Sequence, residues 1–385
     1  MTHVFLIAGE PSGDRLGAAL MAGLKTLHPG IRFSGIGGPA MAGQGLDSLF
    51  PMETLSVMGL AEILPRLPEL FRRRDQAVSA IAGARPDALI TIDSPDFCLR
   101  VAGRARAARP DLPTIHYVAP SVWAWRPARA ARMAQIIDHV LALLPFEPPH
   151  MIAAGMSCDF VGHPVVAEPR ATAADIAAFR TRHAIGGPVA LVLPGSRRAE
   201  LSRLLPIFGE AMATIPRDCR IVVPTLPHLS DIVRQATRLW PGAPLVVTDP
   251  VDRRAAFAEA RAALAASGTV SLELAAVGTP MVIAYDMNWF SYQVISRMLS
   301  IDTVTLVNLV VGRKVVPEYL GPACRSGPIG DTFARLLTVP SERDKQRMAL
   351  ADTMDALGRG DDPPGLRAAR SVLAHLGLAG PEASG

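Results

Sequence analysis

Residues 191–205 read Leu-Val-Leu-Pro-Gly-Ser-Arg-Arg-Ala-Glu-Leu-Ser-Arg-Leu-Leu, an apolar run that ends in a Pro-Gly-Ser-Arg turn and opens into an amphipathic helical pattern. A helix start offers unpaired backbone N–H groups and the positive end of the helix dipole. Gly195 permits close approach of a ligand to the backbone beside Ser196, and Arg197 adds a guanidinium group. The segment therefore predicts a diphosphate site, although an ordinary strand-to-helix turn has the same pattern.

Short apolar runs alternate with helical patterns along the whole chain, which is typical of parallel β-α-β units. The predicted strands lie near residues 3–8, 31–36, 88–92, 113–118, 139–144, 189–193, 220–223, 245–248, 262–265 and 281–285. The pattern restarts after Gly162-His163-Pro164, a turn-rich connection. We expect an α/β protein with two Rossmann-like doubly wound domains facing across a cleft, where ligands bind at the carboxyl ends of the strands.

The same pattern divides the chain into four predicted parts. Two domains are expected at residues 1–165 and 166–340. Helices at 341–378, interrupted by Asp361-Asp362-Pro363-Pro364-Gly365, are expected to cross back over the first domain. Residues 379–385 are predicted to form a flexible tail.

Composition excludes several classes of protein. Of the 385 residues 49% are hydrophobic, yet no run of 18 apolar residues free of charge occurs, so no membrane span is expected. The first residues read as a strand rather than as a signal peptide, and we expect a cytoplasmic protein. The net charge of +4 comes with no nucleic-acid-binding module. Four cysteines without a C-x-x-C pair predict buried or inert thiols and no structural metal site.

The first predicted strand leads into Ala8-Gly9-Glu10-Pro11-Ser12-Gly13-Asp14. Its glycines permit a tight turn, but the segment lacks the Gly-x-Gly-x-x-Gly pattern of dinucleotide-binding loops. Ser12 or Asp14 would cap the next helix, and Asp14 is equally compatible with a binding role. Glu10 belongs to the same strand end.

Two further strand ends in the first half carry polar or aromatic side chains. Asp93 follows the third strand and is a candidate general base, whereas Asp96, which follows a proline, is typical of a turn or cap. Trp123 and Trp125 follow the fourth strand. They would form the wall of a sugar or acyl site, sit at a membrane interface, or simply pack in the core. His116 is compatible with a satisfied core histidine.

A second strand-to-helix turn in the other half, Ala266-Ser267-Gly268-Thr269, has small residues that leave the backbone accessible to phosphate. Glu273, one turn into the helix, would accept hydrogen bonds from vicinal ribose hydroxyls, or would be merely solvated. This turn belongs to the same predicted sheet as Gly195–Arg197. The two turns therefore favour one shared nucleotide site over two ordinary turns that bind no ligand.

These motifs together resemble the lipid-A-disaccharide synthase family from about residue 4 to residue 320, in the family's order. The resemblance is carried by Ala-Gly-Glu-x-Ser-Gly-Asp, Ile-Asp-x-Pro-Asp-Phe, His-Tyr-Val-x-Pro-Ser-Val-Trp-Ala-Trp-Arg, Leu-Pro-Phe-Glu at 144–147, Phe-Val-Gly-His at 160–163, Leu-Pro-Gly-Ser-Arg, Ala-Ser-Gly-Thr and Leu-Val-Asn-Leu at 306–309. It implies a GT-B fold and an inverting glycosyltransferase of Gram-negative lipid A synthesis. The implied donor is UDP-2,3-diacylglucosamine, the acceptor is 2,3-diacylglucosamine 1-phosphate, and the products are a β-1,6-linked disaccharide phosphate and UDP.

The resemblance also implies roles for particular residues. Asp93 would be the general base or its close partner, and Glu10 and Asp14 would be further catalytic residues. Together with Ser12, these two would line the acceptor side. Arg197 would bind the UDP diphosphate. The remaining donor-side residues are Ser267, Gly268, Thr269, Glu273 and Asn308. Domain 1–165 would then face acceptor and membrane, and domain 166–340 would bind the UDP-sugar.

Charge development in such a transfer indicates that no cofactor is needed. The leaving diphosphate gains negative charge, which turn amides and Arg197 would stabilise, and no convincing Asp-x-Asp loop for a metal-bound diphosphate is present. One departure from the family concerns Asp286, which stands where the family tends to have a base. If a cation at that position normally contacts phosphate, we expect Arg253, Arg254 or Arg297 to supply the contact instead.

Both implied substrates carry acyl chains, so we expect contact with the cytoplasmic surface of the inner membrane through Leu60 to Arg74. Apolar residues recur there at helical spacing and lead into Arg72-Arg73-Arg74, although packing on the core explains the same pattern. Pro65 and Pro68 argue against one regular helix. The sequence leaves a homodimer open and predicts no nucleic-acid partner.

Two other functions fit the same residues. A UDP-N-acetylglucosamine 2-epimerase has the same two-domain fold and UDP pocket but needs no acylated acceptor. A non-catalytic nucleotide- or lipid-binding protein is the other alternative. Release of UDP only when the acceptor is present would distinguish transfer from both.

Overall fold

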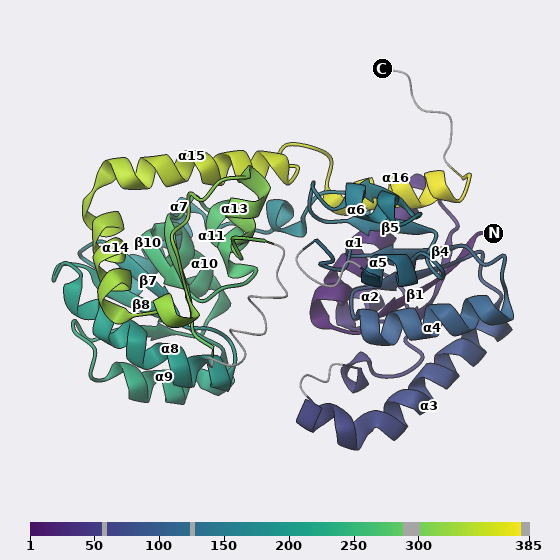
Figure 1. The fold of residues 1–385 in the computed structure, drawn as a ribbon, viewed down its shortest axis with the longest axis horizontal. Coiled ribbons are helices and arrows are strands. Elements are labelled where there is room, and N and C mark those ends of the chain that lie inside the picture. The colour runs from purple at the N-terminus through teal and green to yellow at the C-terminus, as the bar shows by residue number, and fades with distance from the viewer. Residues whose placement is uncertain (56–59, 124–127, 288–300, 379–385) are drawn as a thin grey trace. The chain divides into compact units, whose positions relative to one another are not determined.

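A computed structural model of the chain describes residues 1–55, 60–123, 128–287 and 301–378, with the backbone alone for 60–64. The chain forms two compact units, Met1–Ala167 with Gly360–Gly385, and Glu168–Arg359. Each unit holds a six-stranded parallel sheet with helices packed on both of its faces (Figure 1). The predicted α/β class with two Rossmann-like domains is therefore confirmed.

Unit 1 has the strand order β2-β1-β3-β4-β5-β6. Its strands are β1 (His3–Ala8), β2 (Arg32–Ile36), β3 (Ala88–Ile92), β4 (Thr114–Tyr117), β5 (His139–Ala142) and β6 (Ser157–Phe160). Its helices are α1 (Pro11–Leu27), α2 (Pro39–Ala42), α3 (Leu60–Ala84), α4 (Pro95–Ala108), α5 (Ala128–Met133), α6 (Pro148–Ala153) and α16 (Pro364–His375). Short 3₁₀ turns lie at Met52–Thr54 and Pro164–Ala167.

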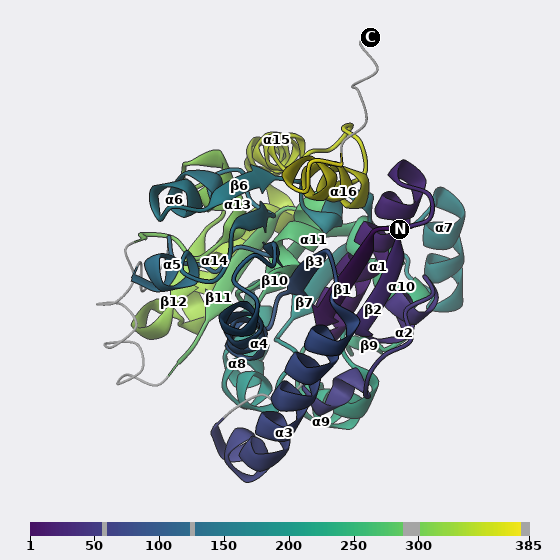
Figure 2. The same cartoon turned by 90° about the vertical axis from the view of Figure 1, so that its right-hand side faces the viewer.

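Alternation along β1 separates the two core layers of unit 1. Val4 and Leu6 belong to the cluster that includes residues of α1 and α16, whereas Phe5 and Ile7 belong to the cluster under α3 and α4. Helices α3 and α4 lie side by side on that second face (Figure 2). Both faces of β1 are apolar because the sheet is covered on both sides.

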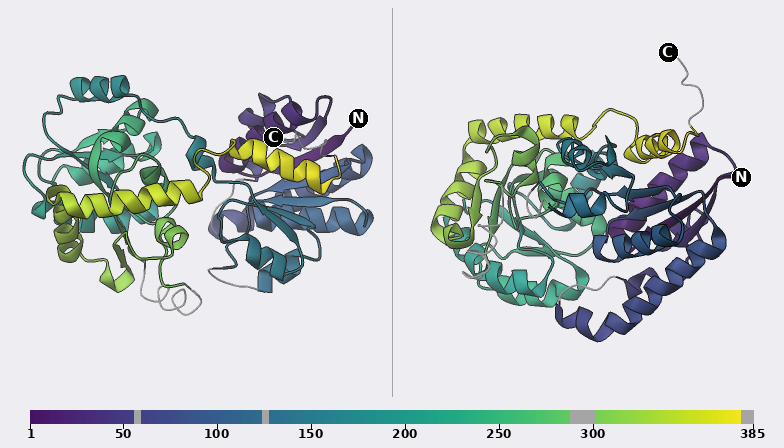
Figure 3. Two further views of the ribbon diagram at one scale, coloured as in Figure 1. Left: turned by 90° about the horizontal axis from the view of Figure 1, so that it is seen from above. Right: turned by 45° about the vertical axis from the view of Figure 1, so that its right-hand side comes forward.

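The last helix, α16, joins unit 1 by close packing against α1 (Figure 3). A Cβ atom at Gly23 would lie 2.6 Å from the carbonyl oxygen of Gly365, and one at Gly365 would lie 2.6 Å from the carbonyl oxygen of Ala19. Larger side chains at either glycine would push the helices apart. The chain thus returns to its first unit through a contact between small residues.

Unit 2 has the strand order β12-β11-β10-β7-β8-β9, which is the Rossmann order when read from β9. Its strands are β7 (Val189–Leu193), β8 (Arg220–Pro224), β9 (Leu245–Val247), β10 (Ala260–Ala265), β11 (Met281–Tyr285) and β12 (Glu318–Leu320). Its helices are α7 (Ala173–Arg182), α8 (Arg198–Ala211), α9 (Ser230–Thr237), α10 (Pro250–Glu259), α11 (Val270–Ala276), α13 (Leu306–Val311), α14 (Ser326–Thr338) and α15 (Pro340–Ala356). Short 3₁₀ turns lie at Met212–Thr214, Pro227–Leu229 and Gly321–Ala323.

The structure differs from the sequence prediction in three places. Strands β6 and β12 were not predicted. Helix α3 continues through Pro65 and Pro68 and bends along its length (Figures 1 and 3). The prolines thus make it irregular, as expected, but they do not end it, because proline bends a helix that is otherwise packed. The stretch 341–378 is divided, since α15 packs on α11, α13 and α14 of unit 2, and only α16 lies in unit 1.

Candidate functional site

The Pro-Gly-Ser-Arg turn lies where the strand order of the second sheet reverses. Strands β7 and β10 are neighbours there, and Leu193 pairs with Ala265 at their carboxyl ends. The turns at 194–197 and 266–269 therefore begin next to each other, at the ends of neighbouring strands. In open α/β sheets this switch point is the place where ligands bind.

Backbone geometry at both turns fits a close ligand approach. Gly195 has a φ of 111° and Gly268 a φ of 141°, conformations that L side chains rarely adopt. Ser267 is half-buried and Thr269 is exposed, so the second turn is open to solvent. The structure thus brings together the two small-residue turns that the sequence singled out.

The start of α8 already holds a carboxylate. Glu200 Oε2 accepts hydrogen bonds from the backbone N–H groups of Ser196 at 2.9 Å and Arg197 at 3.3 Å. The expectation that these N–H groups are unpaired is wrong, because an acid at the third helical position turns back over the turn as in a capping box. The carboxylate marks the turn as a place that attracts an anion.

The charged residues around these turns have partners that the sequence did not indicate. Glu273, in the first turn of α11, forms an ion pair with Arg253 of α10. Asp286 lies 3.6 Å from Arg203 of α8, which offsets the charge of the unusual acid. Arg297 lies outside the described residues.

Asn308 organises a loop through its side chain. It is 1% exposed. Its Nδ2 donates to Thr303 Oγ1 and to the carbonyl oxygen of Val316, and its Oδ1 accepts from the N–H groups of Val315 and Val316. Both Nδ2 hydrogens and both acceptor positions of Oδ1 are engaged with protein, so the structure gives the side chain a positioning role and not the direct contact that the resemblance implied.

The candidate residues Glu10 and Asp93 of unit 1 lie in segments that follow the carboxyl edge of the first sheet. Ala8 pairs with Ile92, Ile92 with Tyr117, and Tyr117 with Leu141, so the segments after β1, β3, β4 and β5 start at the same edge. Glu10 and Asp93 follow the first two of these strands. A Cβ atom at Gly9 would lie 2.6 Å from Ser94 Oγ, which shows how closely the first two segments pack.

Backbone strain is concentrated at this edge. Asp93, Ser94 and Val118 have φ values of 52°, 41° and 83°. Left-handed backbone at residues other than glycine costs about 1 kcal/mol or more per residue and clusters at functional sites. Asp93 N donates to the carbonyl oxygen of Tyr117, and Asp93 Oδ1 accepts from Ser94 N at 2.9 Å, so its carboxylate is held in place.

Asp14 has a structural task. The residue is 4% exposed, and its carboxylate accepts hydrogen bonds from the N–H groups of Gly38, Ala40 and Met41 at the start of α2. The predicted catalytic role is therefore corrected to a buried cap of α2. Ser12 does not cap α1 either, because Pro11 is its first residue and Glu10 is the N-cap.

The tryptophan segment contacts Glu147, the last residue of the Leu-Pro-Phe-Glu stretch at 144–147. Trp123 Nε1 donates to Glu147 Oε1 at 3.3 Å, and the Trp123 ring lies edge-on to Phe146. Glu147 is buried, and burial raises its pKa to about 7 against the lowering effect of N–H donors from Leu144, Trp123 and Leu143. Trp125 lies outside the described residues.

Apolar residues of α3 line a cavity beside the strained strand end. The cavity has a volume of about 280 Å³. It is lined by Glu10, Leu55, Leu67, Leu70, Phe71, Arg74, Ser94, Pro95, Asp96, Phe97 and Arg100. Both apolar side chains and polar ones, Glu10, Ser94, Arg74, Asp96 and Arg100, line it, a mixture that suits an amphiphilic ligand.

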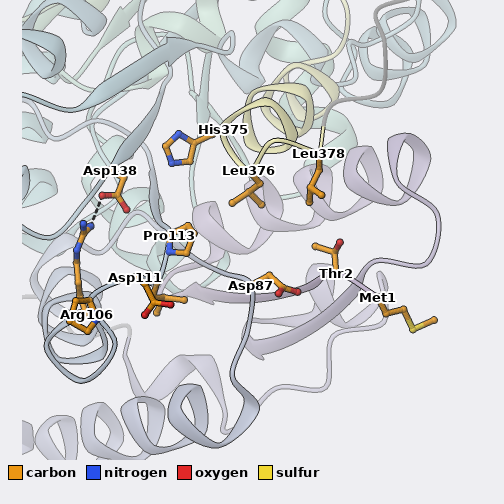
Figure 4. Close-up of a pocket in the computed structure, with 12 residues that line it drawn as sticks. Met1, Thr2, Asp87, Arg106, Asp111, Pro113, Asp138, His375, Leu376 and Leu378 are labelled. Atoms are coloured by element: carbon orange, nitrogen blue, oxygen red, sulfur yellow. Dashed lines mark hydrogen bonds and ion pairs between the residues drawn. The ribbon is translucent and has the colours of Figure 1, made fainter.

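A larger cavity of about 760 Å³ lies at the opposite edge of the first sheet (Figure 4). It is lined by residues that precede strands, such as Thr2, Asp87 and Pro113, and by the ion pair of Arg106 with Asp138 at 2.6 Å. Ligands of such sheets bind at the carboxyl ends, so this cavity is set apart from the candidate site.

Other expectations concern residues in the core. His116 is 1% exposed, and its Nδ1 lies 2.7 Å from Thr91 Oγ1, as a satisfied core histidine does. The four cysteines are free and buried. No helix among the described residues is long and apolar enough to cross a membrane.

Two Rossmann-like sheets, with paired small-residue turns at the switch point of the second, define a protein of the GT-B fold class, which glycosyltransferases share with UDP-sugar epimerases. The family model of lipid-A-disaccharide synthetase matches residues 4–361. The chain belongs to the lipid-A-disaccharide synthase family, and it is a hexosyltransferase of lipid A synthesis.

Comparison with individual proteins agrees with this assignment. The chain is 58% identical to the lipid-A-disaccharide synthase of Ruegeria pomeroyi, over 98% of this chain and 96% of that protein. Among solved structures, it resembles UDP-GlcNAc 2-epimerase from Neisseria meningitidis bound to UDP-GlcNAc, with a TM-score of 0.62 and 13% identity over 98% of this chain and 99% of that one. The calicheamicin glycosyltransferase CalG4 gives a TM-score of 0.58 and 16% identity over 99% and 100%. Likeness at such identity shows the fold alone and does not favour the isomerase alternative.

Proposed function

We propose that the two turns of unit 2 and the strand ends of unit 1 carry out the reaction. In this reaction a 2,3-diacylglucosaminyl group passes from its UDP derivative to 2,3-diacylglucosamine 1-phosphate. The observation that carries the proposal is the pair of turns at 194–197 and 266–269, joined at the switch point of a sheet in Rossmann order. Unit 2 holds the UDP-sugar, and unit 1 supplies the acceptor side and the base.

The UDP diphosphate binds over Gly195–Arg197. There it replaces the Glu200 carboxylate on the N–H groups of Ser196 and Arg197, and the Arg197 guanidinium contacts it from the side. The second turn, from Ser267 to Thr269, lines the same site. As the bond from the anomeric carbon to the UDP oxygen breaks, UDP leaves with the electron pair, and these donors stabilise the charge that develops on it.

Asp93 acts as the general base. The 6-hydroxyl oxygen of the acceptor forms the new bond to the anomeric carbon while its proton passes to the Asp93 carboxylate, and a single displacement inverts the configuration. Positive φ at Asp93 and Ser94 supports this role, because strained backbone persists where it fixes a reacting group. Glu10 belongs to the same edge and lines the cavity that receives the acceptor.

The cavity beside α3 receives an acyl chain, and α3 meets the membrane surface. Phe71 is 43% exposed, although its side chain is aromatic. Arg72 to Arg74 follow it directly, and arginines at the edge of an apolar helix face suit anionic lipid phosphates. The enzyme then takes both acylated substrates from the membrane surface without crossing it.

The base assignment is tested with Asp93→Asn and a matched Asp111→Asn control. Asp111 belongs to the same unit, is exposed, lies 3.7 Å from Arg109 and lines the cavity at the opposite edge of the sheet. With defined donor and acceptor, Asp93→Asn is expected to release UDP about 10²- to 10⁴-fold more slowly, the usual contribution of a general base. Asp111→Asn should stay near the parent rate, and both should melt at similar temperatures.

The outcome that rejects the base assignment is full activity of Asp93→Asn. Transfer itself is tested separately in the parent enzyme. UDP should appear only when the acceptor is present, and mass spectrometry should detect the acylated disaccharide phosphate. Release of UDP without acceptor would contradict the transfer mechanism whatever the variant does.

A further inference from the structure

A second charged cavity lies on the amino edge of the second sheet. It has a volume of about 480 Å³ and is formed where β7 and β10 begin, together with residues of α7, α10 and α15. Its lining residues are Arg180, Gly186, Gly187, Pro188, Val189, Ala258, Glu259, Ala260, Arg261, Arg343 and Arg347. The turns proposed for UDP follow the other end of β7, five residues and about 17 Å away. This cavity is therefore separate from the donor site.

Four arginines and one acid line this cavity, which we name the arginine pocket. Arg180 is neutralised, because it pairs with Glu259 and donates to the carbonyl oxygen of Gly187. Arg347 has only a 3.6 Å contact with Asp344 on the same helix, and pairs of such exposed groups are weak. Arg261 forms no ion pair with any residue in the described part of the chain.

The remaining charges repel one another. Arg343 is fixed, since its Nη1 donates to the carbonyl oxygens of Leu336 at 2.8 Å and Leu337 at 3.1 Å at the end of α14. Burial, and then the nearby Arg261 and Arg347, lower its pKa, and Asp344 opposes them less strongly. Three guanidinium groups thus face one cavity with little compensation from the protein, a state that a bound anion would relieve.

We propose that the arginine pocket binds a phosphate-bearing anion of at least two negative charges. Guanidinium groups match phosphate oxygens through paired N–H donors, and several arginines around one cavity favour a multivalent anion over a single carboxylate. Such a group is supplied either by a free polyphosphate or by the phosphates of anionic lipid headgroups. The inference goes beyond the transfer reaction, because the pocket lies at the edge of the sheet that the reaction does not use.

The proposal is tested by calorimetry with tripolyphosphate on the full chain, with UDP present in excess so that the donor site is occupied. The double variant Arg261→Gln, Arg347→Gln is expected to bind tripolyphosphate at least about tenfold more weakly than the parent. The control Arg359→Gln removes an exposed arginine of the same unit that pairs with Asp355, and its affinity should be unchanged. Thermal unfolding of each protein verifies that it is folded.

A second arm distinguishes the source of the phosphate. The same proteins are sedimented with vesicles of phosphatidylcholine, with and without phosphatidylglycerol. Retention that depends on phosphatidylglycerol and is lost in the double variant supports a lipid phosphate, and tripolyphosphate binding alone supports a free anion. If the double variant matches the parent in both arms, or the parent responds in neither, the proposal is overturned.

Discussion

At the scale of the residue, Glu200 decides how an anion enters the second unit. Its carboxylate bonds to Ser196 N and Arg197 N, where the UDP diphosphate is proposed to bind. Glu200→Gln keeps an oxygen that accepts from the turn but removes a negative charge, so UDP should bind about three- to tenfold more tightly. Calorimetry measures the change, and Glu210→Gln, on the same helix, is the charge-matched control. Weaker binding in Glu200→Gln alone would place the diphosphate elsewhere.

The residues that the sequence misjudged are those whose partners lie far along the chain or across a loop. The residue types at Asp14 and Asn308 indicated polar roles, but Asp14 bonds to backbone N–H groups 24 to 27 residues away. Asn308 bonds across the following turn to Val315 and Val316. Glu200 did carry a local signal, since an acid at the third helical position is typical of a capping box.

At the scale of the element, α3 is where the proposal of membrane contact is tested. Leu67 and Phe71 lie one turn apart and line the same cavity. The double change to Glu is expected to release the enzyme from anionic vesicles by several fold, because a charged face no longer enters lipid. Co-sedimentation measures this release, and Ser79→Glu, an exposed site on the same helix, is the control.

Retention of the α3 double variant on vesicles at the parent level would exclude this face as the membrane contact. Thermal unfolding is expected to change little, because Phe71 is 43% exposed and Leu67 is only half-buried. A large drop in melting temperature would instead support packing on the core, the alternative that the sequence left open.

Strands with long apolar runs were predicted well, whereas two of the four edge strands, β6 and β12, were not. The core strands, such as Ala88–Ile92 and Val189–Leu193, are buried on both faces, and their sequences are apolar apart from Thr91. The edge strands Ser157–Phe160 and Glu318–Leu320 are short and partly polar, so pairing with a neighbour, not hydrophobicity, defines them. The switch point followed from strand order, which alternation alone does not give.

At the scale of the whole molecule, acid should destabilise the two units unequally. Burial lowers the pKa of His116, His139 and His163 to about 4, and all three lie in unit 1. Each stays neutral in the folded state but takes up a proton on unfolding near or below pH 6.5, so stability is lost as the pH falls from there towards 4. Glu147 has a pKa raised to about 7, so in the folded state it keeps a proton that the unfolded chain releases. Its effect on stability therefore offsets that of one histidine.

The three histidines take up protons on unfolding and the one glutamate releases one. We therefore predict that the free energy of unfolding of unit 1 falls by about 1.4 kcal/mol per pH unit for each net proton taken up, between about pH 6.5 and 4.5. Hydrogen exchange in urea at about pH 7 and pH 5, resolved by peptide, should show unit 1 losing protection at lower urea in acid. His139→Gln keeps groups that bond to Ser157 and Ser371 but cannot titrate, so it should reduce the shift, whereas exposed His150→Gln should not. Earlier loss of protection in unit 2 at pH 5 would contradict the prediction, because it would place the acid-sensitive groups outside the unit that holds these histidines.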